Sequence, residues 1–434
     1  MRRQKAEIAR ADGVHVWDTT GKRYLDGSSG AMVVNIGHSN ASVLAAMRAQ
    51  MDRATFAMRM HFECEAAERL AAKTAARAPK GLSKVFYTSG GSEAVESAIK
   101  LARNHALARG EAERWKVISR FPAYHGCTLG ALAVTGYAPM TAPYAPLMRE
   151  MPKIPAPRAY LDGLDPTDPA TGHHYAAMLE DKILAEGPGT VLAFLVEPVG
   201  GASTGALVPP AGYLQEIRAI CDRHGVLLIH DEVVSGGGRV GTFFAGDLWG
   251  VTPDLITVSK GFGGGYVALG AVIAKDEIVD AVMDAGGFPH GFTYGGNPLA
   301  CAAGIAVMDE IDRHNLMENA NKIGATLKTR MTGLMNRHAL IGDVRGTGLL
   351  LAFELVSDRA TLAPLPAALN AYDTFVETAY ANGLIVYARR TRGGHTGDHF
   401  VVAPPLITTE ADVDELIEKL DASLTAFSAA NGLP

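Results

Sequence analysis

The sequence has few cysteines, and they are widely spaced. Its 434 residues include four, Cys64, Cys127, Cys221 and Cys301. They form neither a Cys-X-X-Cys pair nor the dense pattern of a small disulfide-bonded domain. Because disulfides are rare in reducing compartments, this usage favours a cytoplasmic protein.

Long apolar runs are also missing. The longest ones, such as Val191–Val196, are as long as a strand and far shorter than the roughly 20 residues that span a bilayer. The basic start at Met1–Lys5 is not followed by the apolar segment of a secretory signal. We therefore expect no association with a membrane.

Neither sign of charge is strongly in excess. The chain has 40 Lys and Arg against 46 Asp and Glu, a formal net charge of −6, and no run of basic residues. A groove for nucleic acid needs clustered Lys and Arg side chains. The sequence therefore predicts no nucleic-acid partner.

Short apolar segments alternate with amphipathic segments through the middle of the chain. The predicted strands are Ser83–Thr88, Lys116–Ser119, Val191–Val196, Val226–Ile229 and Leu255–Val258. The predicted helices between them include Glu65–Ala78, Glu93–Arg109 and Tyr213–His224. This alternation predicts an α/β domain with a mainly parallel central sheet and helices on both faces.

The two ends of the chain have a different pattern. Near the start, Val14–Trp17 and Arg23–Leu25 flank a turn and predict a hairpin. Near the end, the predicted strands Leu349–Leu355, Leu384–Tyr387 and Phe400–Ala403 alternate with the predicted helices Ala371–Ala381 and Thr409–Ser428. A chain of this length suggests two domains. We expect a large domain over residues 61–318 and a small α+β domain formed by residues 1–60 and 319–434.

One segment, Pro152–Thr171, contains five prolines. Proline cannot donate a backbone hydrogen bond, and this density of prolines is unfavourable for regular structure. We expect an irregular excursion over the surface there.

Two polar residues end predicted strands. Asp231 follows one strand, and Lys260 closes another, Asp254–Ser259, before a glycine-rich run. The carboxyl ends of parallel strands are where α/β folds bind ligands, so both are candidates for a binding site. Asp231 would also suit the cap of a following helix, and Lys260 could be a solvated surface charge. A metal site formed by Asp231 with His230 and Glu232 is disfavoured, because successive strand residues point to opposite faces.

Small residues also follow a strand at Thr88–Ala94. The backbone amides of Gly91 and Ser92 are free to point at an anion where the next helix begins. Ser92 with Glu93 would equally cap that helix without any ligand. The glycine-rich run after Lys260, Gly261–Tyr266, lacks the spacing of a Walker loop or of a dinucleotide-binding fingerprint.

Taken together, these segments resemble the class III aminotransferases, a family with the fold-type I architecture of pyridoxal-phosphate (PLP) enzymes. Eight stretches occur in the family's order and span nearly the whole chain. They are Trp17–Asp26, Thr88–Ala94, Tyr124–Gly126, Glu197–Val199, Asp231–Val233 with Gly238–Gly241, Ser259–Gly261, Thr293–Pro298 and Pro404–Leu406.

The resemblance implies a role for each matching residue. Lys260 would hold the cofactor as a Schiff base and carry the proton between the substrate and cofactor carbons. Asp231 would keep the pyridine nitrogen protonated, so that the ring can accept electrons. The other implied cofactor contacts are Tyr124 and Val233 on the ring faces, Gly91 and Ser92 at the phosphate, and His125 and Glu197 nearby. No metal is implied.

The resemblance also implies an assembly. Thr293 would reach the cofactor phosphate of a neighbouring subunit. The protein would then be a homodimer with shared active sites, and two such dimers could associate into a tetramer.

The substrate side of the site departs more from the family's pattern. Met32 lies near the place where many amine-active members carry a pocket tryptophan. Arg389 and Arg392 precede the glycine-rich segment Gly393–Gly397, which we expect to be a loop that lets one arginine swing toward a substrate carboxylate. Val234 stands where the family commonly has glutamine, and this change removes no reacting group.

The implied function is PLP-dependent transamination by a ping-pong mechanism. The amino donor would be an amine, an omega-amino acid or an amino acid, and the acceptor a small oxo acid such as pyruvate. The alternatives are an aminomutase on the same scaffold, a fold-type I decarboxylase and a non-catalytic PLP-binding regulator. The regulator would need an added DNA-binding domain, for which the short N-terminal hairpin leaves no room.

Overall fold

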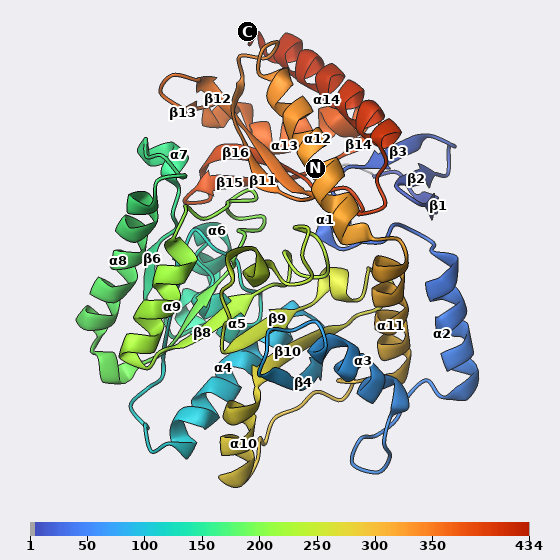
Figure 1. The fold of residues 1–434 in the computed structure, drawn as a ribbon. Helices are drawn as coiled ribbons and strands as arrows, with labels where there is room; N and C mark the ends of the chain where they lie inside the picture. Colours follow the sequence, from blue (N-terminus) through green and yellow to red (C-terminus); the bar gives the residue numbers. More distant parts are fainter. Residues whose placement is uncertain (1–4, 434) are drawn as a thin grey trace.

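A seven-stranded sheet lies at the centre of the molecule (Figure 1). The structure is a computed structural model that describes residues 5–433. In spatial order the strands are β4 (Leu82–Thr88), β10 (Gly270–Lys275), β9 (Leu255–Val258), β8 (Leu227–Asp231), β7 (Val191–Val196), β5 (Lys116–Phe121) and β6 (Lys153–Pro155). The strands from β9 to β6 pair in parallel, and β10 runs antiparallel to both of its neighbours. The predicted mainly parallel sheet is confirmed.

Helices cover both faces of this sheet. On one face lie α4 (Gly91–Ala108), α5 (Leu129–Val134) and α10 (Asp276–Asp284), and on the other lie α8 (Pro169–Glu186) and α9 (Tyr213–His224). In β7, Ala193 and Leu195 pack toward the first group, whereas Phe194 and Val196 pack toward the second. Because successive strand residues face opposite ways, an unbroken apolar strand must be covered on both sides.

Three further helices pack together at the β4 end of the sheet. They are α2 (Ala41–Arg53), α3 (Glu65–Ala75) and α11 (Pro298–Arg313). The segment between α2 and α3 projects as a loop at the lower edge of Figure 1. The remaining short helices are α1 (Ser29–Met32), α6 (Ala138–Thr141), α7 (Ala159–Asp162), η1 (Ala142–Leu147), η2 (Pro188–Thr190), η3 (Ala245–Trp249), η4 (Lys260–Phe262) and η5 (Ala367–Leu369).

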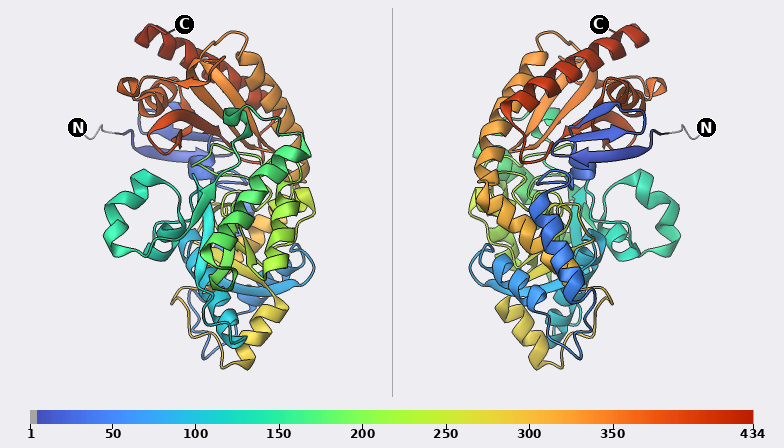
Figure 2. Two further views of the ribbon diagram at one scale, coloured as in Figure 1. Left: turned by 90° about the vertical axis from the view of Figure 1, so that its left-hand side faces the viewer. Right: turned by 90° about the vertical axis from the view of Figure 1, so that its right-hand side faces the viewer.

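A second sheet joins the two ends of the chain. Its strands are β1 (Ile8–Asp12), β2 (His15–Asp18), β3 (Arg23–Asp26) and β14 (Leu384–Ile385). β2 and β3 form the predicted hairpin. β14 pairs in parallel with β3, with Leu384 opposite Leu25. The first and last described elements, β1 and α14 (Glu410–Asn431), both lie in the upper part of the molecule in Figure 2.

The third sheet, here called the C-terminal sheet, is antiparallel. Its strands are β11 (Ile341–Thr347), β12 (Leu350–Asp358), β16 (Thr396–Val402) and β15 (Tyr387–Arg392), with β13 (Ala363–Pro364) paired to β12. The helices α12 (Leu316–Leu334), α13 (Ala371–Ala381) and α14 (Glu410–Asn431) cover it. Its core includes Phe375 and Phe400, whose ring centroids are 4.5 Å apart. The predicted α+β character of this part is confirmed.

The expected irregular excursion at Pro152–Thr171 is wrong in part. β6 pairs in parallel with β5, and α8 begins within the segment at Pro169. The prolines occupy positions that tolerate them, because β6 is an edge strand and Pro169 is the first residue of its helix. The carboxylate of Asp168 accepts a hydrogen bond from Ala170 N and caps α8.

The expected loop at Gly393–Gly397 is confirmed only in part, because β16 begins within it at Thr396. Arg389 and Arg392 belong to β15, which pairs with β16, and the turn begins only at Gly393. The expected strand Leu384–Tyr387 is divided between β14 and β15, which belong to different sheets. In the described part of the chain, no helix is both long and apolar enough to cross a membrane.

Candidate functional site

One cavity brings together eight of the predicted residues. It lies at the carboxyl ends of β7, β8 and β9 and has a volume of about 210 Å³. Its lining consists of Gly91, Ser92, Tyr124, His125, Gly126, Glu197, Asp231, Val233, Val234, Ser259 and Lys260. Segments that are far apart in the sequence therefore meet at the edge where a parallel sheet offers a ligand site.

Asp231 is the last residue of β8, and its carboxylate is buried. Oδ2 lies 2.7 Å from His125 Nδ1. Oδ1 accepts hydrogen bonds from Val233 N at 3.1 Å and from Thr257 Oγ1 at 3.3 Å. The other ring nitrogen of His125, Nε2, is buried and has no partner within residues 5–433. Buried polar atoms are normally hydrogen-bonded, so this nitrogen indicates a place for a bound group.

Lys260 follows β9 and begins η4 with a φ of 47°. A non-glycine residue in this conformation costs on the order of 1–3 kcal/mol and is typical of functional sites. Burial lowers the pKa of Lys260 to about 8, although the negative charges of Asp231 and Glu197 partly oppose this shift. At a pH near 8 the amine is therefore present in both its charged and its neutral form.

The first turn of α4 is open to a ligand. Its N-cap is Gly90, which provides no side chain to cap the helix. Ser92 lies inside the helix, and its hydroxyl accepts a hydrogen bond from Cys127 N at 3.1 Å. A Cβ at Gly91 would lie 2.9 Å from Val233 Cγ1, so no larger residue fits there. Uncapped amides at the start of a helix favour an anion.

Glu197 comes directly after β7 and is buried. Its Oε1 accepts a hydrogen bond from Gly201 N at 2.8 Å. Burial raises the pKa of Glu197, the charge of Asp231 adds to the rise, and Arg120 opposes it. Tyr124 is half-buried, and burial raises the pKa of its phenol to about 12, so it remains neutral.

Four predicted residues do not line this cavity: Thr293, Met32, Arg389 and Arg392. Thr293 lines a separate cavity of about 490 Å³ together with Met58 and Met60. Met32 is only 1% exposed and packs in an apolar cluster with Val240. Arg392 donates to Leu362 O and lies 3.6 Å from the Glu354 carboxylate.

The three arginines of β15 differ in their partners. Arg390 and Arg392 each lie beside a carboxylate, Asp398 and Glu354 respectively. Arg389 donates instead to the hydroxyl of Tyr387 at 2.5 Å, and within the described residues it has no ion pair. Its charge also helps to lower the pKa of Lys260, so it acts on the site. Of the three, Arg389 alone is a cation near Lys260 without a carboxylate partner.

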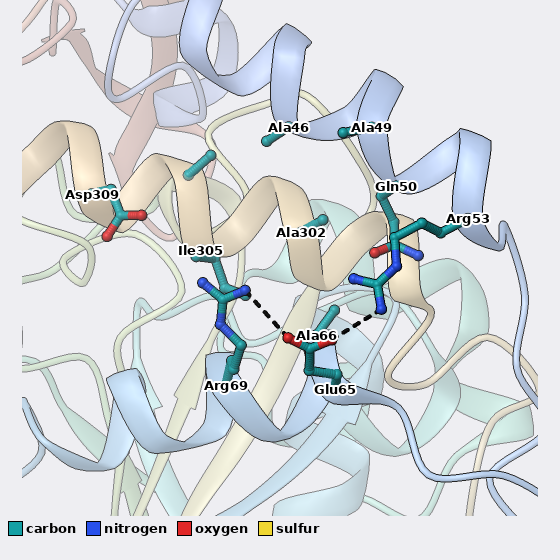
Figure 3. Close-up of a pocket in the computed structure, with 11 residues that line it drawn as sticks. Ala46, Ala49, Gln50, Arg53, Glu65, Ala66, Arg69, Ala302, Ile305 and Asp309 are labelled. Carbon is teal, nitrogen blue, oxygen red and sulfur yellow. Dashed lines mark hydrogen bonds and ion pairs between the residues drawn. The ribbon is translucent and has the colours of Figure 1, made fainter.

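A further cavity lies between α2, α3 and α11 (Figure 3). Its volume is about 260 Å³, and alanines form much of its wall. Its lining has two carboxylates: Glu65, with Arg53 at 3.0 Å and Arg69 at 3.7 Å, and Asp309, with Lys73 at 2.7 Å. Exposed ion pairs of this kind contribute little, and none of the predicted site residues lies here.

Sequence reasoning missed several residues of the site. Ser259 lines the cavity and is adjacent to Lys260, so its place could have been inferred. Arg120 is buried behind Glu197 and donates to its backbone oxygen at 2.7 Å. A single arginine in an apolar strand carries no local signal of such a role, because the contact depends on tertiary structure.

Comparison with known proteins agrees with this geometry. The model of the family described as aminotransferase class-III matches residues 2–424. The chain is similar to a putrescine–pyruvate aminotransferase of Pseudomonas aeruginosa, with 32% identity over 98% of this chain and 91% of the relative. An (S)-enantioselective omega-transaminase from Thermomicrobium roseum is 38% identical, with a TM-score of 0.93 over 98% of this chain and 94% of that one. A PLP-bound amine transaminase from an uncultivated Pseudomonas species is 36% identical, with a TM-score of 0.91 over 98% and 96%.

The pKa of Lys260 leads to a prediction for the chain without cofactor. Because burial destabilises the charged amine, the pKa of Lys260 is about 8. The pKa of a lysine in water is about 10.4. The rate at which an amine-directed reagent modifies Lys260 should therefore rise with a midpoint near pH 8, as measured by peptide mapping. Lys84 on the exposed edge of β4 is the control. A common midpoint for both lysines would contradict the prediction.

Proposed function

Because the chain belongs to the class III aminotransferase family, we propose that it transfers an amino group from an amine, an omega-amino acid or an amino acid to a small oxo acid such as pyruvate. The observation that carries this proposal is the meeting of Lys260 and Asp231 in one cavity at adjacent strand ends. The named activities of the omega-transaminase and the putrescine–pyruvate aminotransferase support the substrate class.

The cavity suits PLP, the cofactor of this family. The uncapped start of α4 at Gly91 and Ser92 is suited to its phosphate. The wall also has a buried nitrogen, Nε2 of His125, that has no hydrogen-bond partner among the residues the structure describes. When bound, the cofactor supplies a ring that accepts electrons from the reacting carbon.

Two side chains perform the proton chemistry that we assign to the site. Lys260 is the point of covalent attachment and the base that carries a proton, and a pKa near 8 suits both proton uptake and release. Asp231 is held by His125 and Thr257, and its carboxylate would keep the pyridine nitrogen protonated. Tyr124 and Val233 would enclose the two ring faces.

Glu197 completes the set of buried carboxylates beside the cofactor site. It lies with Asp231 in the same lining. Its charge acts on Lys260 in the same sense as that of Asp231. We propose that Glu197 stabilises the positively charged form of the Lys260 amine.

For the substrate carboxylate we favour Arg389 over Arg392. A cation with a neutral phenol as its partner is free to bind an anion, whereas Arg392 already lies beside Glu354. Binding of the oxo acid would use Arg389, and binding of an amine without a carboxylate would leave Arg389 on Tyr387. Burial makes Met32 a support of the pocket wall and not a substrate contact.

We also propose that the active unit is a homodimer, which could pair into a tetramer. Met60, which is 82% exposed, lines the cavity that contains Thr293. Two more exposed apolar side chains, Phe62 at 69% and Tyr294 at 66%, are close to Met60 and Thr293 in the sequence. Exposed large apolar side chains that gather on one surface are typical of a protein interface. Thr293 would reach the partner's phosphate from this surface.

Two broader proposals concern the whole chain. The large domain would comprise residues 61–318, and residues 1–60 and 319–434 would form the small one; the pairing of β3 with β14 supports the union of the two ends. All four cysteines are free thiols, which supports a cytoplasmic location.

The substrate proposal is tested by comparing acceptors with and without a carboxylate. With an amine donor, Arg389→Leu should lower kcat/KM for pyruvate about 10- to 100-fold, because a charge-assisted hydrogen bond is lost. Activity with an aldehyde of similar size should change little, and Arg392→Leu is the matched control. Absence of transamination in the unaltered protein, across amines and amino acids with pyruvate or 2-oxoglutarate, would overturn the proposed function. Equal losses for both acceptors would overturn the role of Arg389.

Asp231→Asn should retain much of the cofactor but lose most turnover. The amide cannot stabilise a protonated pyridine nitrogen, while the phosphate and Lys260 contacts persist. The loss of a buried charge partner costs on the order of a few kcal/mol, so kcat should fall by orders of magnitude. Cofactor content by absorbance and kcat by steady-state assay check this. Near-normal turnover would mean that Asp231 is only structural.

The shared site is tested by subunit complementation. Lys260→Ala chains and Thr293→Ala chains are mixed and allowed to exchange. One site of the mixed dimer carries both changes and the other carries neither, so activity should rise well above the sum of the parents. The loss of one hydroxyl–phosphate hydrogen bond in the Thr293→Ala parent would cost about 1.5–3 kcal/mol. If activity stays at the sum despite confirmed exchange, Thr293 acts within its own subunit.

A further inference from the structure

The segment that follows Glu197 forms a tight loop, here called the Glu197 loop (residues 198–207). Its two arms are joined by hydrogen bonds from Gly200 N to Leu207 O at 2.8 Å and from Ala206 N to Gly201 O at 3.2 Å. The loop lies against the C-terminal sheet, and side chains of that sheet bind its backbone. It therefore connects one wall of the cavity to a distant part of the chain.

Arg345 of β11 makes the main contact with this loop. Its Nε donates to Gly205 O at 2.7 Å, and its Nη2 donates to Thr204 O at 3.1 Å. The side chain is almost fully buried. Two consecutive carbonyls bound by one rigid guanidinium leave the loop little freedom to slide.

Carboxylates compensate the buried charge of Arg345. Nη1 lies 2.7 Å from Asp343 Oδ2, and Nη2 lies 3.1 Å from Glu354 Oε2. The ring of Tyr160 covers the guanidinium at 4.5 Å, and its hydroxyl donates to the same Glu354 oxygen. A buried cation with such partners remains charged and ordered, which suits a fixed support.

His399 of β16 makes a third contact. Its Nε2 lies 2.7 Å from Ala202 O, and because a carbonyl only accepts, this nitrogen must be the donor. Burial lowers the pKa of His399 to about 3, so the ring is neutral at physiological pH. Three carbonyls of the Glu197 loop, at Ala202, Thr204 and Gly205, are thus held by two strands of the C-terminal sheet.

The loop in turn holds Glu197. Gly201 N donates to Glu197 Oε1 at 2.8 Å. A Cβ at Gly201 would lie 2.9 Å from that oxygen and 3.2 Å from Val234 Cγ2, so the backbone is as close as glycine allows. A displacement of the loop would therefore displace the carboxylate.

We propose that Arg345 is a positioning residue of the active site: it holds the Glu197 loop against the C-terminal sheet and so keeps the Glu197 carboxylate beside Lys260 and Asp231. His399 supports the same loop through its hydrogen bond to Ala202 O. This inference rests on the proposed function of the cavity, because it assigns Arg345 a role in the reaction performed there.

The test compares Arg345→Lys with a matched arginine. Lysine keeps the charge beside Asp343 and Glu354 but cannot bind two carbonyls in the same plane. Arg359→Lys is the control, because Arg359 also binds backbone carbonyls, those of Ile341 at 2.8 Å and His338 at 2.7 Å, away from the cavity. Both variants should lower the melting temperature, so stability alone does not separate them.

The distinguishing readout is the titration of Lys260 in the chain without cofactor. Glu197 raises the pKa of Lys260, so a displaced carboxylate should move the midpoint below the value of about 8 in the unaltered chain. In Arg345→Lys the midpoint should fall and kcat should drop about 10- to 100-fold with little change in the KM of the amino donor, as expected for a misplaced group. In Arg359→Lys both should stay unchanged.

A second pair of variants keeps the test valid if Arg345→Lys does not fold. His399→Leu removes the donor to Ala202 O and should shift the midpoint in the same direction, whereas His399→Gln keeps a donor and should restore most of it. Equal midpoints in Arg345→Lys and Arg359→Lys, or in both His399 variants and the unaltered chain, would overturn the positioning role. Failure of the unaltered protein to bind pyridoxal phosphate would instead overturn the proposed function, since the titration needs no cofactor.

Discussion

The buried carboxylate of Asp231 is the constraint on which the site depends. A carboxylate loses much of its hydration at a buried strand end, and such a loss is unfavourable unless hydrogen bonds replace the water. His125, Val233 and Thr257 provide those hydrogen bonds, and each comes from a different part of the chain. The position of His125 therefore follows from the charge on Asp231, and the segment that carries His125 also carries Tyr124.

Burial and the nearby carboxylates act on the pKa of Lys260 in opposite directions. Burial alone would drive the lysine toward its neutral form, whereas the two carboxylates nearby favour the cation. The resulting pKa of about 8 places the amine where it can take up or release a proton at little cost. A site with one carboxylate fewer would hold a more strongly depressed amine, so Glu197 matters to the balance even though it makes no direct bond to Lys260 in the structure.

Where the predicted residues follow strands, the structure brings them into one cavity. Contacts that depend on distant segments were not predicted from the sequence. β7 was identifiable because a strand covered on both faces is apolar throughout. Asp231 and Lys260 were identifiable because they stand at strand ends. Most of β15 was not predicted as a strand, since its charged residues look solvated until Asp398 and Glu354 are placed beside Arg390 and Arg392.

The other misses have the same cause. Prolines in Pro152–Thr171 suggested irregular chain, but edge pairing and a helix start accept proline without loss of a hydrogen bond.

Arg239 was noticed only as part of a motif. In the structure it is fully buried and donates to Asn35 Oδ1 at 2.7 Å and to Leu349 O at 3.1 Å, so it binds the two ends of the chain to the middle. Burial lowers its pKa to about 9, and the charge of Asp26 opposes this shift only in part. Arg345 receives full counter-charges and Arg239 does not, although both join the middle of the chain to its C-terminal part. A substitution at Arg239 would thus remove hydrogen bonds only, whereas one at Arg345 would also take a cation away from the buried carboxylate of Glu354 and the half-buried one of Asp343.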